Sequence, residues 1–321
     1  MEDLVTRYSI PPYNIKYWEL GNEPDVDPSL LPPDSPFGCW GDAKDPYYGG
    51  GYYAEMLKVV YPAIKAADPE AKVLIGGLLL DCDPDNPPQG KNCNSALFLK
   101  GILENGGGNY FDLVSFHGYN LYWGSLSLDE HHPNWINRGG VVIGKISYIR
   151  ELLNAYGLEK PLIDTEGALL CSEGATNYCH PPDAKFFDLQ ADYVVWLFVR
   201  NWAYGISGTI WYSFDGPGWR YGSLLGPDQK PRPAYKAYQF MTRELDQAHY
   251  SGIVDQYPAL HAYAFSSPGK KIWILWSPDG NEYTIHLPDG VVHVYNKYGV
   301  EEPLSGSEIK VNSPIYVEFN P

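Results

Sequence analysis

The sequence has no apolar run long enough to span a membrane. Its amino terminus also has no signal-peptide core, because Glu2, Asp3 and Arg7 come too early. Positive charge is scarce: 23 Lys and Arg stand against 39 Asp and Glu, for a formal net charge of −16. We therefore expect neither nucleic acid nor a membrane surface as a partner. No G-x-S-x-G sequence occurs, which disfavours an esterase-type serine hydrolase.

Cysteine is sparse, with five residues, but four of them are spaced as two pairs. Cys82 and Cys93 bracket one Pro/Asn/Asp-rich loop, Cys171 and Cys179 bracket another, and Cys39 is left over. Short loops closed in this way predict two disulfides, and hence a secreted or extracytoplasmic location. A zinc site is the alternative, and it is less favoured because the sequence has no C-x-x-C pair.

Aromatic residues are abundant, whereas charged residues make up only 19% of the chain. The sequence has 27 tyrosines and 10 tryptophans. Aromatic faces with polar tips suit stacking against neutral, hydroxyl-rich ligands such as sugars. The alternative is that many of these side chains simply fill a large core.

Five strands and the helices between them can be predicted from the spacing of apolar residues. The predicted strands span residues 15–20, 72–80, 111–116, 161–165 and 209–214. The predicted helices span residues 3–9, 52–67, 97–103, 141–156, 186–204 and 233–245. This alternation predicts an α/β domain over residues 1–249 with a mostly parallel sheet. From about Ser251 the period changes to two, which predicts a small antiparallel, β-sandwich-like domain over residues 250–321.

The stretch Tyr17-Trp18-Glu19-Leu20-Gly21-Asn22-Glu23-Pro24 reads as a buried strand that ends in a sharp turn. Glu23 is therefore expected at the carboxyl end of a strand, where α/β sheets place their chemistry. Glu166 closes a later strand in the same way. Two carboxyl groups about 5–5.5 Å apart are what a retaining glycosidase needs, one as the acid and one as the nucleophile.

Four segments resemble clan GH-A glycoside hydrolases: YWELGNEPD, FHGYN, LIDTEG and IWYSFDGPG. They look like the ends of strands four, six, seven and eight of that barrel, and family 39 is the nearest likeness, with family 79 second. The resemblance implies an incomplete TIM-type (β/α) barrel, with equivalents of strands four to eight and without the first three βα units. It is specific at Asn-Glu-Pro and covers residues 1 to about 245.

The resemblance also assigns roles to individual residues. It implies that Glu23 is the acid/base, Glu166 the nucleophile and Asn22 a contact of the sugar 2-hydroxyl. Further residues are expected to bind or surround the substrate: His117, Tyr119, Trp211, Trp18, Trp123 and Trp219. The implied function is a retaining hydrolase of β-linked sugars acting on a glycoside or oligosaccharide. The alternative is a carbohydrate-binding pseudo-enzyme that lost turnover with its first strands.

No cofactor or metal is expected. His131, His132 and His180 have no carboxylate partner at fixed helical spacing, so they read as loop histidines. Asp81, Asp83 and Asp85 have the first spacings of a calcium loop, but Asn86 stands where its glycine belongs and Asn92 where its closing glutamate belongs. Five parallel strands leave two open edges, so either the chain is a fragment or something else covers them. The candidates are extra strands from the long loops or the carboxyl-terminal domain, or a second subunit. A homodimer is the favoured one, because the long loops are rich in Pro and Gly.

Overall fold

The computed structural model describes residues 1–35, 37–171, 179, 182–216, 218–304 and 306–320. The chain forms two compact units. The first consists of Met1–Gly118, Glu130–Glu166 and Ile206–Ile210, and the second of Tyr119–Asp129, Gly167–Gly205 and Trp211–Pro321. None of the helices in the described ranges combines the length and the apolar character that crossing a membrane requires.

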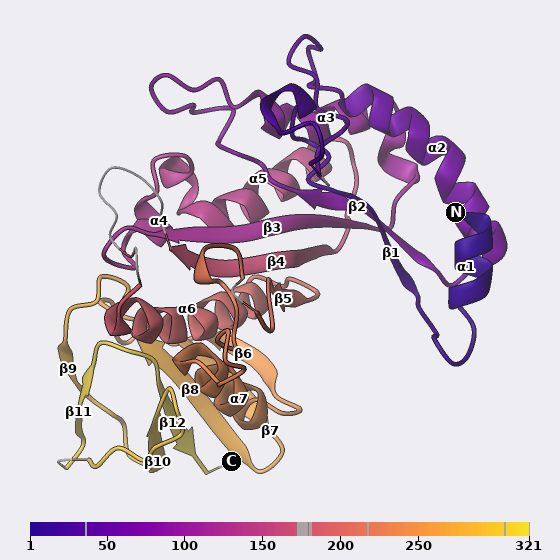
Figure 1. Ribbon diagram of the computed structural model, residues 1–321. Coiled ribbons are helices and arrows are strands. Elements are labelled where there is room, and N and C mark those ends of the chain that lie inside the picture. Colours follow the sequence, from indigo (N-terminus) through magenta and orange to yellow (C-terminus); the bar gives the residue numbers. More distant parts are fainter. Residues whose placement is uncertain (36, 172–178, 180–181, 217, 305, 321) are drawn as a thin grey trace. The chain divides into compact units, whose positions relative to one another are not determined.

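The first unit is built on a parallel sheet whose strands follow one another in chain order (Figure 1). The strands are β1 (Tyr17–Asn22), β2 (Lys72–Leu78), β3 (Leu113–Tyr122), β4 (Leu162–Cys171) and β5 (Thr209–Trp211), of which the last three continue into the second unit. The helices of this unit are α1 (Glu2–Tyr8), α2 (Gly50–Ala67), α3 (Leu97–Glu104) and α5 (Val141–Ala155), and α4 (Leu128–His131) lies where the units divide the chain. The predicted strand–helix alternation and partial barrel are confirmed.

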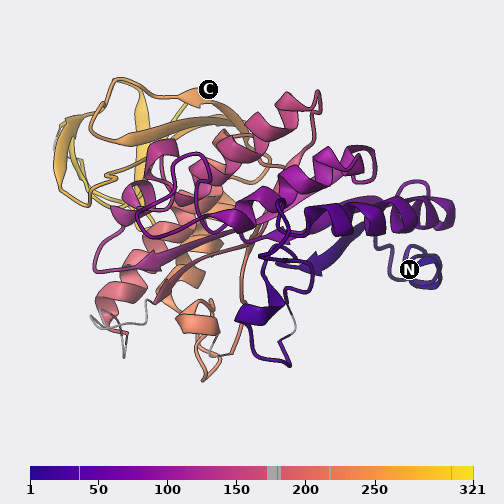
Figure 2. The same ribbon diagram turned by 90° about the horizontal axis from the view of Figure 1, so that it is seen from above.

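Helices α2, α3 and α5 lie along one face of this sheet (Figures 1 and 2). The aliphatic run of β2 is buried from Val73 to Leu78, as expected for a strand with neighbours on both sides. The hydroxyl of Tyr53, on α2, donates to the carbonyl of Leu20 at 2.5 Å and accepts from the N–H of Gly76 at 3.0 Å. One helix side chain therefore holds β1 and β2 in register.

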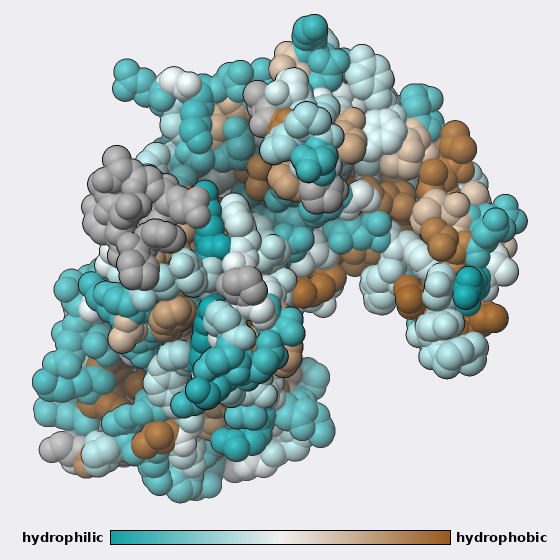
Figure 3. Space-filling model, in the orientation of Figure 1, coloured by the Kyte–Doolittle hydropathy of each residue, from teal (hydrophilic) through white to brown (hydrophobic). Residues whose placement is uncertain are grey.

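The edges of the sheet are β1 and β5, as predicted. Both expose apolar or aromatic side chains: Tyr17 on β1 is 61% exposed and Ile210 on β5 is 51% exposed. Leu4 and Ile10, on α1 and just after it, are exposed as well, and apolar surface appears over this part of the chain in Figure 3. The first unit thus presents apolar surface beside an unpaired strand.

Three predicted strand ends were wrong. Strands β3 and β4 continue past His117 and Glu166, because Gly118 and Gly167 do not have the positive φ of a turn glycine. Gly118 instead permits a close approach, since a Cβ there would lie 2.4 Å from Oδ2 of Asp164. Strand β5 is shorter than predicted, because the backbone at 213–214 pairs with residues 224–225 instead.

The second unit contains two helices and an antiparallel β region. The helices are α6 (Ala184–Ala203) and α7 (Pro233–Glu244). The main sheet has the order β10-β12-β8-β7-β6, and β9 pairs with β11. These strands are β6 (His249–Ile253), β7 (His261–Ser267), β8 (Lys270–Trp276), β9 (Tyr283–His286), β10 (Val291–Asn296), β11 (Glu308–Val311) and β12 (Ile315–Phe319). The predicted antiparallel sheet is confirmed.

Both predicted disulfides are present. Cys82 pairs with Cys93 in the first unit, with 5.1 Å between the Cα atoms. Cys171 pairs with Cys179 in the second, with 5.6 Å between the Cα atoms. Cys39 is exposed and free of a disulfide.

Candidate active site

Glu23 is held at the carboxyl end of β1 by a turn in an uncommon backbone conformation. Its φ is +46°, in the left-handed region that a non-glycine residue rarely adopts. The backbone N–H of Glu23 donates to the carbonyl of Gly77, at the end of β2, at 3.0 Å. The next strand along the sheet therefore fixes the turn that carries this carboxylate.

His117 connects Glu23 to Glu166. The imidazole Nδ1 lies 2.9 Å from Oε1 of Glu23 and 3.4 Å from Oε2 of Glu166. The His117 side chain is only 1% exposed, whereas 14% of the Glu23 side chain and 28% of the Glu166 side chain are accessible. The first unit thus brings together three residues that lie far apart in the sequence, with the imidazole beneath two solvent-accessible carboxylates.

The space for this imidazole exists because residue 77 is glycine. A Cβ at Gly77 would lie 2.1 Å from Nε2 of His117, far inside van der Waals contact. The imidazole therefore packs against the bare backbone of β2. This close approach explains a glycine inside an otherwise aliphatic strand.

The surroundings of His117 favour its charged form. Burial lowers the pKa of the imidazole, but the hydrogen bond to Glu23 and the charges of Glu166 and Glu23 outweigh that effect. Lys145 opposes them weakly, and the net result is a raised pKa. A protonated imidazole facing two carboxylates makes charge-assisted hydrogen bonds, which hold side chains more firmly than neutral ones do.

Two further predicted residues of the first unit lie on β1. Asn22 is the last residue of the strand and its side chain is exposed, while its backbone carbonyl accepts from the N–H of Gly38 at 3.1 Å. Trp18 is half-buried. Their roles toward a sugar stay predictions.

The other four predicted residues belong to the second unit. The ring of Tyr119 meets that of Trp219 edge-on, with 5.7 Å between centroids. Trp219 is 50% exposed and Trp123 is 48% exposed, so both present aromatic surface to solvent. Trp211 is 8% exposed, and its indole N–H donates to the carbonyl of Gly222 at 2.7 Å.

The sequence analysis missed three charged residues close to the site. Glu19 accepts hydrogen bonds from Ser115 at 2.5 Å and from Thr165 at 3.1 Å, which links β1 to β3 and β4. Asp25 and Lys145 are both buried. A signal for Lys145 was present, because it lies on the same face of its predicted helix as Val141, Val142 and Ile149.

Glu23, His117 and Glu166 also form a group that could offer three ligand atoms to a metal ion, all within 4.8 Å of one another. The calcium-like loop is neutralised from within the chain, since Arg138 pairs with Asp83 at 3.0 Å and with Asp85 at 2.6 Å.

The structure places His132 in a loop, as predicted, but His131 at the end of helix α4. The ring of His132 accepts from the N–H of Asn134 at 3.2 Å, within its own loop. His131 is exposed, and His180 lies outside the described residues.

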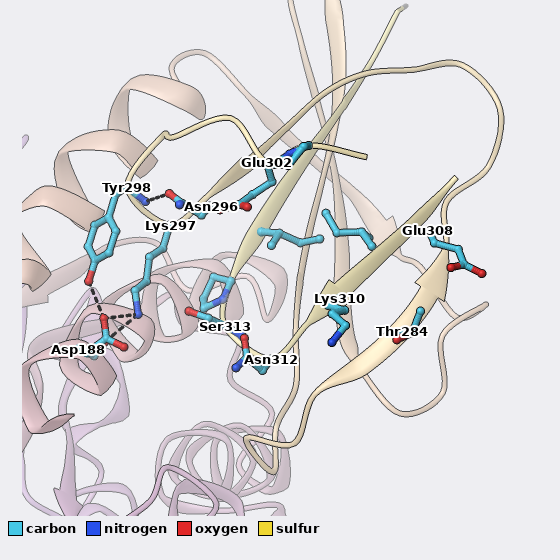
Figure 4. A pocket seen from close by; sticks show the side chains of 14 residues that line it. Asp188, Thr284, Asn296, Lys297, Tyr298, Glu302, Glu308, Lys310, Asn312 and Ser313 are labelled. Carbon is cyan, nitrogen blue, oxygen red and sulfur yellow. Dashed lines mark hydrogen bonds and ion pairs between the residues drawn. The ribbon is translucent and has the colours of Figure 1, made fainter. Parts of the chain in front are cut away.

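A separate cavity of about 620 Å³ lies in the second unit, beside β9, β10 and β11 (Figure 4). Its polar groups bind one another: Lys297 pairs with Asp188 at 2.9 Å, and Asn296 donates to Glu302 at 2.8 Å. The pair of Lys297 and Asp188 links the end of β10 to α6 beside this cavity.

No protein-family model and no curated protein matches the sequence. Solved structures do match. A family 39 glycoside hydrolase from Bacteroides cellulosilyticus WH2 aligns with a TM-score of 0.67 and 20% identity, over 99% of this chain and 60% of its own. A family 44 xyloglucanase from Paenibacillus polymyxa aligns with a TM-score of 0.61 and 12% identity, over 100% and 70%.

A family 51 α-L-arabinofuranosidase from Bifidobacterium longum aligns with a TM-score of 0.59 and 15% identity, over 96% of this chain and 68% of its own. The chain thus spans about 60–70% of the length of these enzymes. At such identities the likeness shows the fold. The chain has the fold of clan GH-A glycoside hydrolases, as a partial (β/α) barrel followed by an antiparallel β region.

Proposed function

We propose that this protein is a retaining glycoside hydrolase in which Glu166 is the nucleophile and Glu23 the acid/base. One observation carries the proposal: two accessible carboxylates from different strands meet at one imidazole, with an oxygen of each within 4.8 Å of the other. Retaining enzymes need carboxyl groups about 5–5.5 Å apart, whereas inverting enzymes need about 6.5–9.5 Å to admit a water molecule. The separation here fits the retaining class.

The reaction would proceed by two displacements. A carboxylate oxygen of Glu166 attacks the anomeric carbon as the bond to the leaving oxygen breaks, and protonated Glu23 gives its proton to that oxygen. Glu23, now ionised, then takes a proton from water, which attacks the anomeric carbon and releases Glu166. His117 would hold both carboxylates in place during these steps.

The substrate would be a β-linked glycoside or oligosaccharide. Asn22 is proposed to contact the sugar 2-hydroxyl, and the exposed rings of Trp123 and Trp219 to supply stacking surface. His117, Tyr119, Trp18 and Trp211 complete the proposed set. Two disulfides support an oxidising, extracytoplasmic location.

A carbohydrate-binding protein without turnover is the second candidate. The open sheet favours it, since β1 and β5 remain edge strands with exposed side chains. Such a protein would bind sugars through the same residues and hydrolyse none.

The proposal is tested by a screen of activated aryl β-glycosides. We expect turnover by the wild type and none by Glu166→Ala, because alanine has no carboxylate that could form the covalent intermediate. Added azide should restore some activity to Glu166→Ala and give a glycosyl azide of inverted configuration. Full activity in Glu166→Ala would remove the nucleophile assignment, and sugar binding without turnover by the wild type would support the second candidate.

Glu23→Ala serves as the matched variant. The rate of hydrolysis should fall far more for substrates with poor leaving groups than for activated ones, because only the former need protonation of the leaving oxygen. The basic limb of the pH–rate profile should also flatten. An equal loss for all leaving groups would assign Glu23 a structural role.

A further inference from the structure

Two buried charges lie beneath the candidate site, and the proposed mechanism uses neither. Asp25 is fully buried and the Lys145 side chain is 4% exposed. Burying a charge is unfavourable unless hydrogen bonds or an opposite charge compensate it. Apolar residues would pack α5 onto the sheet at lower cost, so the contacts of these two charges point to another role.

Asp25 fastens the turn that carries Glu23 to the end of β2. Its Oδ1 accepts from the N–H of Leu79 at 2.9 Å and its Oδ2 from the N–H of Leu80 at 2.8 Å. The N–H of Glu23 donates to the carbonyl of Gly77 close by. Three hydrogen bonds therefore hold the turn after β1 against Gly77, Leu79 and Leu80, at and just after the end of β2.

Lys145 fastens that same segment to β3. Its Nζ donates to the carbonyl of Leu79 at 2.6 Å and to the carbonyl of His117 at 2.8 Å. Leu79 thus gives its N–H to Asp25 and its carbonyl to Lys145. The ammonium reaches the backbone of the residue whose imidazole contacts both glutamates.

We propose that Asp25 and Lys145 are positioning residues, which lock the ends of β1 and β2 to the middle of β3 so that the imidazole of His117 stays between Glu23 and Glu166. The functional meaning of this lock rests on the proposed function. Both side chains are buried and bind backbone groups, so both act through His117 and the turn at Glu23.

The charges of the network fit this role. Burial raises the pKa of Asp25 to about 6, against the hydrogen bonds from Leu80 and Leu79. Burial lowers the pKa of Lys145 to about 8, while the charges of Asp25, Asp164, Glu23 and Asp81 favour the ammonium form. Burial thus opposes both charges, and the hydrogen bonds to Asp25 and the acidic neighbours of Lys145 support them.

The first test is an NMR titration of the imidazole of His117 in ¹³C-histidine-labelled protein, with His117→Gln to assign the signal. If Lys145 holds His117 in place, Lys145→Met should lower the pKa of His117, because burial then acts without the contacts to Glu23 and Glu166. If Lys145 acts through its charge alone, its removal should raise that pKa. An unchanged or higher pKa in Lys145→Met would overturn the proposal.

Asp25→Asn is the second variant, in case Lys145→Met does not fold. The asparagine side chain of this variant has one acceptor oxygen, so it can accept from only one of the N–H groups of Leu79 and Leu80. We therefore expect the pKa of His117 to fall, by less than in Lys145→Met. Lys297→Met is the matched control, since Lys297 is also 4% exposed and its Nζ binds Asp192 at 2.7 Å in the second unit. It should cost stability without moving the His117 titration, and a shift equal to that of Lys145→Met would contradict the assignment.

An activity measurement separates this proposal from the proposed function. If the wild type hydrolyses aryl glycosides, Lys145→Met should lower kcat by about 10- to 100-fold with little change in KM, as expected for a misplaced catalytic group. Wild-type kcat in Lys145→Met would overturn the positioning role and leave the hydrolase standing. If no glycoside is turned over, the proposed function fails, and the NMR titration still decides whether the lock exists.

Discussion

At the scale of single residues, the position of His117 depends on the missing side chain of Gly77 as well as on the carboxylates of Glu23 and Glu166. Gly77 supplies no side chain, which leaves room for the ring. Glu23 and Glu166 supply the two acceptors at Nδ1. The candidate site is therefore sensitive to added volume as well as to lost charge.

Gly77→Ala should disturb the site by sterics alone. Its Cβ would lie 2.1 Å from Nε2 of His117, so the imidazole must move away. We expect kcat on an aryl glycoside to fall by about 100-fold, the effect of a displacement of about 1 Å. Gly208→Ala is the control, because its Cβ would meet only the flexible end of Ile163, at 3.2 Å. Equal rates for the wild type and Gly77→Ala would show that His117 does not position the carboxylates.

At the scale of elements, a shared lysine fastens α7 to the sheet of the second unit. Lys270 on β8 binds Glu244 of α7 at 2.6 Å and also binds Glu318 of β12. Two carboxylates in hydrogen-bonding contact cannot both ionise without repulsion, so the pair shares a proton. Glu244, the more buried of the two, carries it, and burial together with the hydrogen bond to Glu318 raises its pKa to about 7.

Stability should therefore depend on pH through Glu244. Its folded pKa lies above its unfolded value of 4.5, so its contribution is complete below pH 4.5 and is lost as pH rises through about 7. Gln at this position keeps both hydrogen bonds without titrating. We expect Glu244→Gln to be more stable than the wild type by roughly 2 kcal/mol at pH 8, with the difference shrinking toward pH 5.

Urea unfolding of the wild type and Glu244→Gln between pH 5 and pH 8 measures this difference. Glu282→Gln, in the exposed pair with Lys310, is the control and should give no pH-dependent difference. A pH-independent difference for Glu244→Gln would show that Glu244 is ionised throughout this range.

At the scale of the whole molecule, the five-stranded sheet ends in two edge strands, β1 and β5, among the described residues. Strand β1 exposes Tyr17 and β5 exposes Ile210, and neither has a partner strand on its outer side in the part of the chain that the structure describes. Unprotected edges of this kind promote association. The net charge of −16 opposes it, because like-charged chains repel at low ionic strength.

The prediction of a homodimer can be tested by light scattering at dilute concentration and moderate salt. We expect twice the mass of one chain, since isologous pairing covers the same edge on both copies with one surface. Tyr17→Lys should shift the equilibrium toward the monomer, because a charged side chain guards an edge. A wild-type monomer at all concentrations would rule out association as the means of covering the edges.

The sequence by itself determined the order and type of the elements of the sheet. Five apolar runs separated by helical patterns specify a parallel sheet, because burial on both faces requires such runs. The spacing of the cysteines predicted both disulfides, because each pair closes a short loop and a cysteine in such a loop has few other cysteines within reach. The strand ends were less certain, because Gly118 and Gly167 look like turn residues in sequence and are extended in the structure.

Only the tertiary structure decided which side chains meet. Asn-Glu-Pro marks Glu23 and the FHGYN resemblance marks His117 as a site residue. Neither shows that the imidazole contacts both Glu23 and Glu166, or that Gly77 leaves the space for it. Asp25 and Lys145 are 120 positions apart and both bind Leu79. The physical reason is range: strand and helix patterns arise from neighbours along the chain, whereas a site of buried charges depends on contacts that exist only after the strands have aligned.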